Sequence, residues 1–166
     1  MNLIRHVEDQ CWEVLAQVSD PEIPVLSVLD LGMIRGVEIN PQDEIIVRLT
    51  PTYSGCPATD LLKAEITQAF EAHELTPVKV VVDLSEAWTT DWMSEQGKQK
   101  LQQYGIAPPK GESNSCGTHV ALSDGIQCPH CHSHHTRLLS EFSSTACKAL
   151  YKCQECLEPF DYFKCI

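Results

Sequence analysis

The chain of 166 residues carries 23 acidic and 12 basic side chains, which gives a net charge of −11, and 43% of its residues are hydrophobic. This length suits one domain of moderate size joined to a small module. No apolar run is long enough to cross a membrane, and the first ten residues lack the apolar core of a secretion signal. We therefore expect a cytoplasmic protein without a membrane segment. The acidic excess argues against nucleic acid as a partner, because phosphates are repelled.

The first predicted element is an amphipathic helix over residues 2–19, where apolar residues recur at helical spacing. A proline-containing turn at residues 20–24 ends this helix. Two strands are expected at residues 33–39 and 44–49, and the turn at residues 40–43 joins them into a hairpin.

A second helix is predicted over residues 57–73, followed by a buried strand at residues 78–84. Residues 88–104 add a loop with two tryptophans and a short helix. The order helix–strand–strand–helix–strand predicts an α+β fold or an open α/β sandwich of about 85 residues, and we expect the α+β fold, in which a small sheet of about three strands is packed by helices.

Cys56 lies where a loop meets the start of the second predicted helix. The N-terminus of a helix presents N–H groups and a partial positive charge, and both favour thiolate over thiol. Gly55 allows a tight backbone turn, and Pro57 suits the first helical position. A thiolate held there can bind iron or zinc or attack a disulfide. The alternative is a cysteine that only fills the helix cap or the core.

Asp20 and Glu22 flank the proline turn after the first predicted helix. They can supply oxygen ligands or contact a partner, or they are the solvated acids of a turn that ends a helix. Cys11 sits within the apolar stripe of that helix, where a buried packing thiol is the expected role.

Four cysteines near the C-terminus form two C-x-x-C pairs, Cys128 with Cys131 and Cys153 with Cys156, separated by 21 residues. Two such turns that face each other make a tetrahedral cage of four sulfurs, which predicts a structural zinc site. Rubredoxin-type iron fits the same geometry. Two disulfides are a weaker alternative, because nine cysteines is an odd number and no secretion signal is present.

Three short strands are expected around these cysteines, at residues 136–142, 147–153 and 157–164. They form a C-terminal β zinc ribbon whose small sheet buries too little surface to fold alone. Metal binding supplies the missing free energy, about 10 kcal/mol or more for structural zinc. Four histidines surround the first pair: His130, His132, His134 and His135. One of them can replace a cysteine as ligand, but we expect them to be solvated or to support the ligands, because four thiolates already complete the coordination.

The predicted domain limits are an α+β domain at residues 1–105, a linker at 106–125 and the ribbon module at 126–166. The linker is rich in Pro, Gly and Ser. Residues 1–105 carry 7 basic against 17 acidic side chains, a net charge of −10, whereas residues 126–166 carry 4 of each. The ribbon therefore lacks the basic excess that nucleic-acid-binding ribbons use.

Three further cysteines remain. Cys116 and His119 form an isolated C-x-x-H pair in the linker, which is a weak metal signal. Cys147 and Cys165 can join Cys56 in a second thiol site, or each is inert.

Several motifs resemble known families. The segments DPEIPV at residues 20–25, DLGMI at 30–34 and TPTYSGCP at 50–57 resemble the metal–sulfur cluster assembly domain. The segment WTTDW at residues 88–92, the two C-x-x-C pairs and the C-terminal residues 144–151 (STACKALY) and 160–166 (FDYFKCI) are similar to the PaaD (also called PaaJ) family. These are accessory subunits of the bacterial phenylacetyl-CoA epoxidase system, which serves aerobic phenylacetate degradation.

This resemblance implies roles that spacing alone does not give. Cys56 matches the family's reactive cysteine, and Asp20 matches its acidic partner. The di-iron oxygenase and the reductase, which holds a [2Fe–2S] cluster and a flavin, are separate polypeptides and are the expected partners. The chain itself is expected to be an accessory subunit rather than an enzyme.

The first functional hypothesis is a maturation factor. Cys56, with Cys147 or Cys165, transiently holds iron or an iron–sulfur cluster, while the ribbon docks the client protein. The second hypothesis is a non-catalytic structural or docking subunit, in which Cys56 only caps a helix. A thiol oxidoreductase is disfavoured, because both C-x-x-C pairs are better used as metal ligands. The sequence leaves a homodimer open.

Overall fold

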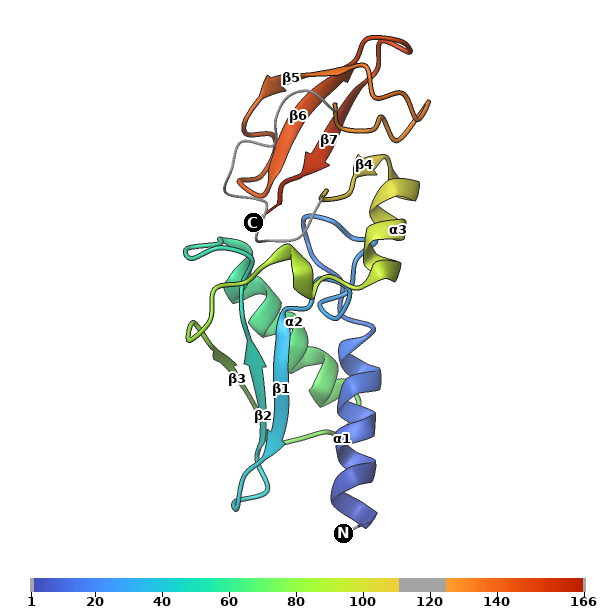
Figure 1. Ribbon diagram of the computed structural model, residues 1–166. Coiled ribbons are helices and arrows are strands. Elements are labelled where there is room, and N and C mark those ends of the chain that lie inside the picture. The colour runs from blue at the N-terminus through green and yellow to red at the C-terminus, as the bar shows by residue number, and fades with distance from the viewer. Residues whose placement is uncertain (1, 111–124, 166) are drawn as a thin grey trace. The chain divides into compact units, whose positions relative to one another are not determined.

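The computed structural model describes residues 2–110 and 125–165. The chain divides into two compact units, Met1–Trp88 and Thr89–Ile166 (Figure 1). Cys116 and His119 lie outside the described residues.

The first unit contains two helices and a three-stranded sheet: α1 (Asn2–Leu15), β1 (Ile34–Ile39), β2 (Ile45–Leu49), α2 (Ala58–Ala72) and β3 (Val78–Val82). The sheet order is β1-β2-β3. β1 and β2 form the antiparallel hairpin that the sequence predicts, whereas β3 runs parallel to β2 after the chain crosses over through α2.

The two helices pack against one face of this sheet, with α1 against β1 and α2, and α2 against β3. On β2, Ile45, Val47 and Leu49 are buried, and the residues between them are half-buried. The helices add buried residues at helical spacing: Cys11, Val14, Leu15, Leu62, Ile66 and Phe70. Each large apolar side chain buried this way stabilises the fold by about 1.5–3 kcal/mol.

Helix α1 ends at Leu15, earlier than the predicted residue 19. The next residues turn and pair with the loop that follows: the Val28 N–H donates to the Val18 carbonyl at 2.9 Å, and the Asp20 N–H donates to the Leu26 carbonyl at 2.8 Å. Backbone groups that would have continued the helix are satisfied by this loop instead.

Trp88 anchors the end of the first unit. Its side chain is buried, and Nε1 donates to the Leu31 carbonyl at 2.8 Å. The anchoring role expected for a buried tryptophan is therefore found within this unit.

The second unit contains a short 3-10 helix, one α-helix and a four-stranded sheet: η1 (Thr90–Trp92), α3 (Glu95–Tyr104), β4 (Ile106–Ala107), β5 (Thr136–Ser140), β6 (Lys148–Cys153) and β7 (Pro159–Phe163). The sheet order is β4-β7-β6-β5. β5, β6 and β7 run antiparallel, and β4 is parallel to β7.

Helix α3 has caps at both ends. Ser94 Oγ accepts from the Gly97 N–H at 2.9 Å, and Gly105 closes the C-terminus in the left-handed conformation at φ 91°. This cap directs the chain straight into β4, which pairs with β7. The boundary between the two compact units therefore lies after Trp88. The domain and linker limits at residues 105 and 125 concern which parts of the chain fold independently, and they remain a prediction.

The fold class predicted from the sequence is confirmed: helices pack on a three-stranded sheet, and a separate β-sheet carries the C-terminal cysteines. β4 is an additional strand that the sequence did not reveal. The ribbon core is formed by residues of β4, of the segment before β5, of β6 and of β7: Ala107, Ile126, Cys128, Ala149, Cys153, Phe160 and Tyr162.

Candidate metal centre

Two turns position the four C-terminal cysteines. In the first turn, the Cys128 carbonyl accepts from the His132 N–H at 2.9 Å, and the Cys128 N–H donates to the Ser133 carbonyl at 2.9 Å. In the second turn, which follows β6, the Cys153 N–H donates to the Glu158 carbonyl at 3.0 Å. Each turn places the first cysteine of its pair at full burial, while the second lies nearer the surface.

The four sulfur atoms all lie within 4.8 Å of one another. Cys128 Sγ is 3.7 Å from Cys156 Sγ, and Cys131 Sγ is 3.5 Å from Cys153 Sγ. A tetrahedral ion with metal–sulfur bonds of about 2.3 Å separates its sulfurs by about 3.8 Å. The donor set therefore fits a four-thiolate metal site.

Backbone N–H groups prepare Cys153 for ionisation. Burial raises the pKa of its thiol, but the N–H groups of Cys156 and Glu155 and contacts with neighbouring thiols lower it to about 6. The Glu155 N–H lies 3.4 Å from Cys153 Sγ.

For Cys156, the N–H of Glu158 lowers the pKa, but burial and the other cysteines raise it to about 12. A bound cation displaces the protons that the thiols of the cluster still carry.

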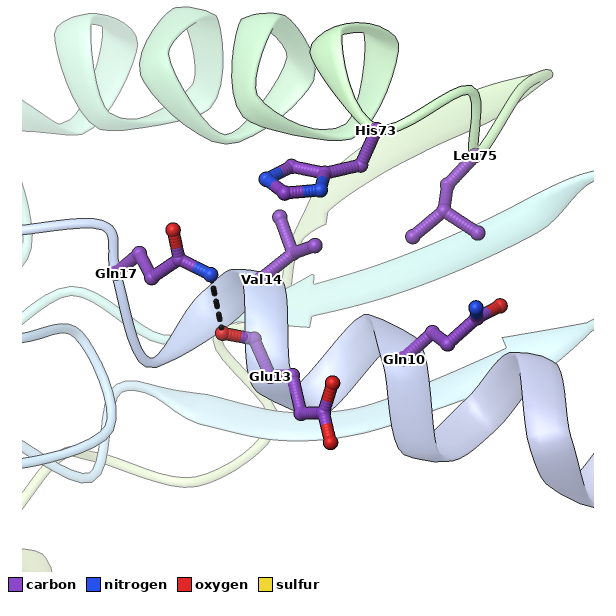
Figure 2. A pocket seen from close by; sticks show the side chains of 6 residues that line it. All are labelled: Gln10, Glu13, Val14, Gln17, His73 and Leu75. Atoms are coloured by element: carbon purple, nitrogen blue, oxygen red, sulfur yellow. Dashed lines mark hydrogen bonds between the residues drawn. The ribbon is translucent and has the colours of Figure 1, made fainter.

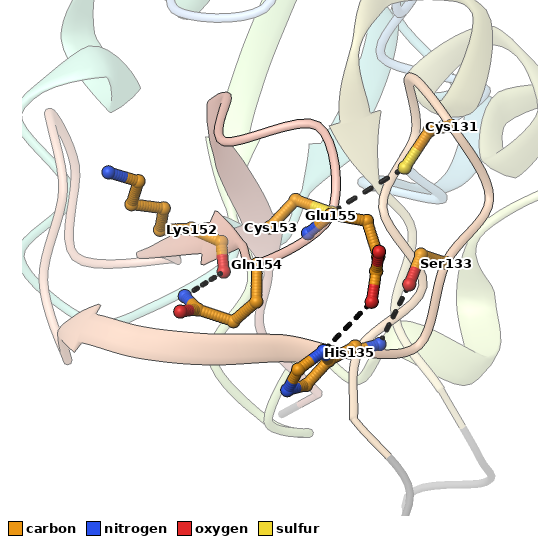
Figure 3. Close-up of polar contacts among 7 residues, drawn as sticks. All are labelled: Cys131, Ser133, His135, Lys152, Cys153, Gln154 and Glu155. Atoms are coloured by element: carbon orange, nitrogen blue, oxygen red, sulfur yellow. Dashed lines mark hydrogen bonds and ion pairs between the residues drawn. The ribbon is translucent and has the colours of Figure 1, made fainter.

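The ring nitrogens of His134 and His135 contact groups other than the cysteine sulfurs. His135 Nδ1 is 3.0 Å from Glu155 Oε1, and the His135 N–H donates to Ser133 Oγ at 3.0 Å (Figure 3). The Gln154 N–H donates to the His135 carbonyl at 2.8 Å. His135 therefore ties the first turn to the second. The sequence did not single out Glu155 or Ser133, although the position of Glu155 between two ligands was a usable signal.

Cys56 lies where the sequence placed it, immediately before α2. Its N–H donates to the Tyr53 carbonyl at 3.3 Å, and Gly55 adopts φ 86° in the turn before it. Pro57 takes the N-cap position and provides no side-chain hydrogen bond to the helix. Cys56 is buried, with 9% of its surface exposed. Nothing in these contacts assigns the thiol a catalytic role, which stays a prediction.

Asp20 serves the turn after α1. Its Oδ1 accepts from the N–H groups of Glu22 at 2.9 Å and Ile23 at 2.8 Å, and the residue is buried. A carboxylate that accepts two backbone N–H groups is a turn-forming group. Asp30 behaves similarly, with Oδ2 accepting from the Ser27 N–H and hydroxyl, and the sequence did not predict this second turn.

Cys147 and Cys165 belong to the second unit, whereas Cys56 belongs to the first. Cys147 is buried, and its Sγ lies 3.0 Å from Thr145 Oγ1. Cys165 is disulfide-bonded and accepts from Thr90 Oγ1 at 3.7 Å. Cys165 therefore becomes a thiolate ligand only after reduction. A shared site with Cys56 remains a prediction.

Two cavities lie in the first unit. The smaller, of about 100 Å³, lies between α1 and the end of α2 and is lined by residues that include Val14, His73 and Leu75 (Figure 2). The larger is an open groove of about 470 Å³ beside Asp20 and α2. Neither cavity is lined by a cysteine, so neither extends the candidate metal centre.

No helix in the described part of the chain combines the length and apolar character of a membrane span.

Two known families match separate parts of the chain, one within each compact unit. Residues 8–82 match the family described as iron–sulfur cluster assembly protein, and residues 112–164 match the PaaD zinc beta ribbon domain. A crystal structure of a domain of unknown function, DUF59, from Bacillus anthracis has the same fold, with a TM-score of 0.54 at 22% identity. The match covers 58% of this chain and 92% of the Bacillus anthracis chain.

Two relatives indicate the family. The chain is 32% identical over 101 residues to an Fe-S protein maturation auxiliary factor of Porphyromonas gingivalis (strain ATCC BAA-308 / W83), over 60% of this chain and 95% of that protein. It is 52% identical over 157 residues to a protein assigned as one of the subunits of 1,2-phenylacetyl-CoA epoxidase in Escherichia coli (strain K12), over 95% of this chain and 92% of that protein. With an assembly-type domain and a PaaD zinc ribbon joined in one polypeptide, the chain belongs to the PaaD family.

Proposed function

We propose that this chain is an accessory factor of a phenylacetyl-CoA epoxidase, and that it helps to mature or maintain an iron or iron–sulfur centre of the oxygenase or reductase. One observation carries the proposal: the relative assigned to the epoxidase matches nearly the whole chain, an Fe-S protein maturation auxiliary factor matches 60% of it, and residues 8–82 match the iron–sulfur cluster assembly family. A protein built on a maturation-factor domain suits the assembly of a partner's metal centre better than catalysis of its own.

In this proposal Cys56 transiently binds the transferred iron or cluster. Cys56 directly precedes Pro57, the N-cap of α2, and the N–H groups and dipole at the N-terminus of a helix favour negative charge. Asp20 is its proposed acidic partner. Cys147 and reduced Cys165 are the proposed additional ligands.

The ribbon has a separate role in the proposal. Cys128, Cys131, Cys153 and Cys156 hold one resident zinc ion, with iron as the alternative metal. The metal is structural: four thiolates leave no open coordination position, so it stabilises the ribbon, which docks the client protein. Metal and sulfide analysis of anaerobically purified protein identifies the ion, and zinc without labile sulfide is the expected result.

The second candidate is a structural or docking subunit without a maturation role. Two observations favour it: the Cys56 side chain is buried, and Asp20 Oδ1 is already occupied by two N–H groups of its own turn. In that case Cys56 contributes only to packing at the start of α2.

Iron loading in cells separates the two candidates. Cells that carry Cys56→Ala should make normal amounts of oxygenase and reductase, but with less iron or labile sulfide per polypeptide. Cys11→Ala is the matched control, because it removes another buried thiol of the same unit. Equal loading in wild-type and Cys56→Ala cells would remove the maturation role and leave the docking role.

A further inference from the structure

Strand β5 forms an open edge of the ribbon sheet in the part of the chain that the structure describes. The sheet order gives it a single neighbour, β6, and residues 137–140 are all exposed. An edge strand presents a row of backbone N–H and C=O groups that another extended segment can pair with. This strand is therefore placed to accept a further strand.

Two cations face each other across β5 and β6. Arg137 and Lys152 are directly opposite partners in the antiparallel register. Like charges in this position repel each other. The ion pairs among the described residues include neither of them. Figure 3 shows the Lys152 side chain extending away from Glu155, whose carboxylate contacts His135.

In the sheet of the first unit, an exposed cation has an acidic partner on the neighbouring strand. Arg48 on β2 donates to Glu38 on β1, with Nε 3.1 Å from Oε1. Its charge is thus neutralised from the neighbouring edge strand. In the ribbon, the edge strand instead supplies a second positive charge, so the local field at β5 attracts an anion from outside the sheet.

One aliphatic side chain lies on the opposite face of β5. Leu138 is the cross-strand partner of Tyr151, so it lies on the face away from Arg137. Leu138 is 40% exposed. A strand added at this edge therefore meets cations on one face and the exposed side chain of Leu138 on the other.

We propose that β5 is a docking edge for an extended segment of a partner protein that alternates acidic and aliphatic residues. The carboxylates of that segment approach Arg137 and Lys152, and its aliphatic side chains cover Leu138. The backbone pairs along β5 as far as the irregularity between Leu138 and Ser140. This inference rests on the proposed docking role of the ribbon and specifies the chemistry of the partner.

Binding of a short capped peptide that alternates glutamate and valine to the metal-loaded full chain tests the inference. We expect saturable binding by fluorescence anisotropy, together with slower hydrogen exchange of the β5 amides. The double variant Arg137→Gln/Lys152→Gln should bind roughly threefold to thirtyfold more weakly. Lys98→Gln, which removes a cation from α3 of the same unit, should bind as the wild type does.

Two comparison ligands complete the test. A peptide of the same composition with its glutamates clustered should bind more weakly, because its charges fall on both faces of the added strand. A single-stranded oligothymidine should not bind.

Several outcomes would overturn the inference: no binding of the alternating peptide, equal binding by the double variant, equal binding of the clustered peptide, or oligothymidine binding that the double variant loses. Protection of the outward-facing β5 amides, which do not donate to β6, before peptide is added would do so too. This assay measures docking alone, so it can fail while iron loading still depends on Cys56. Peptide binding at β5 together with equal iron loading in Cys56→Ala and wild-type cells would remove only the maturation role.

Discussion

Lys148 and Asp161 form an ion pair inside the ribbon, with Nζ of the lysine 3.5 Å from Oδ2 of the aspartate. The Lys148 side chain is only 6% exposed, and Ser143 Oγ donates to the other carboxylate oxygen. The pair joins the first residue of β6 to β7, at the end of β6 away from Cys153. Burial of a lysine at this position depends on the carboxylate that faces it.

Asp161→Asn should therefore destabilise the ribbon by about 2 kcal/mol, because it leaves a buried ammonium group without its counter-charge. Hydrogen exchange of the β6 and β7 amides measures the loss. Lys148→Met combined with Asp161→Asn should recover most of it, since no buried charge remains. A double variant as unstable as Asp161→Asn alone would show that the ion pair is not the cause.

Cys131→Ser should lower the metal content and unfold the ribbon, while the amide spectrum of residues 2–88 stays that of the folded wild type. The reason is that three thiolates hold a tetrahedral ion weakly, and the small ribbon core depends on the metal. Metal analysis and amide NMR measure both effects. Cys11→Ala, which removes a thiol from the first unit, should keep the metal. An intact ribbon after full chelation would contradict a structural role of the ion.

Cys56 should be alkylated faster than Cys11 in the folded protein, by roughly tenfold or more. Cys11 has no exposed surface, and burial raises the pKa of its thiol to about 11, so it stays protonated at neutral pH. Mass spectrometry after timed iodoacetamide treatment measures both rates. Equal or slower labelling of Cys56 would count against its proposed role as a reactive thiol.

Cys11 should also make the stability of the first unit depend on alkaline pH. Burial, with the charge of Glu8, raises its pKa from 9.0 to about 11. The unfolded chain then loses the proton first, so the stabilisation is complete below pH 9 and is lost as the pH rises towards about 11. Urea unfolding across this range measures the decline. Cys11→Ala should show a shallower decline there, with a constant difference from wild type below pH 9. Parallel curves throughout would contradict this assignment.

Asp20→Ala should destabilise the first unit by about 1–3 kcal/mol, because two backbone N–H groups lose their acceptor. Asp20→Asn keeps an oxygen acceptor and should retain most of that stability. If the carboxylate charge also serves metal transfer, Asp20→Asn cells should show low iron loading of the client with a normally folded factor. Normal loading in these cells would restrict Asp20 to its turn.

Much of the fold follows from local patterns. The apolar spacing of Leu62, Ile66 and Phe70 predicted α2 to within a residue at each end, and the C-x-x-C pairs predicted the clustering of four sulfurs. These signals are local, since each depends on residues a few positions apart.

The structural features that the sequence could not predict depend on contacts between residues far apart in the chain. β4 has only two residues, too few for any periodic pattern, and it exists because β7 pairs with it. The end of α1 depends on the loop that pairs with Val18, and the contact of His135 with Glu155 depends on how the two turns meet. The sequence left the burial of Cys56 open between two interpretations, because its position at a helix start indicates a favourable charge environment but not its accessibility.

The pairing of β4 with β7 sets where the ribbon can be excised from this chain. The match to the PaaD zinc ribbon begins at residue 112, after β4 has ended. A fragment cut there keeps all four cysteines but exposes the backbone edge of β7, beside the apolar Phe160 and Tyr162 that Ala107 helps to cover. Such a fragment should bind metal yet associate with itself through the uncovered strand, whereas a fragment that begins at residue 89 keeps its own edge strand.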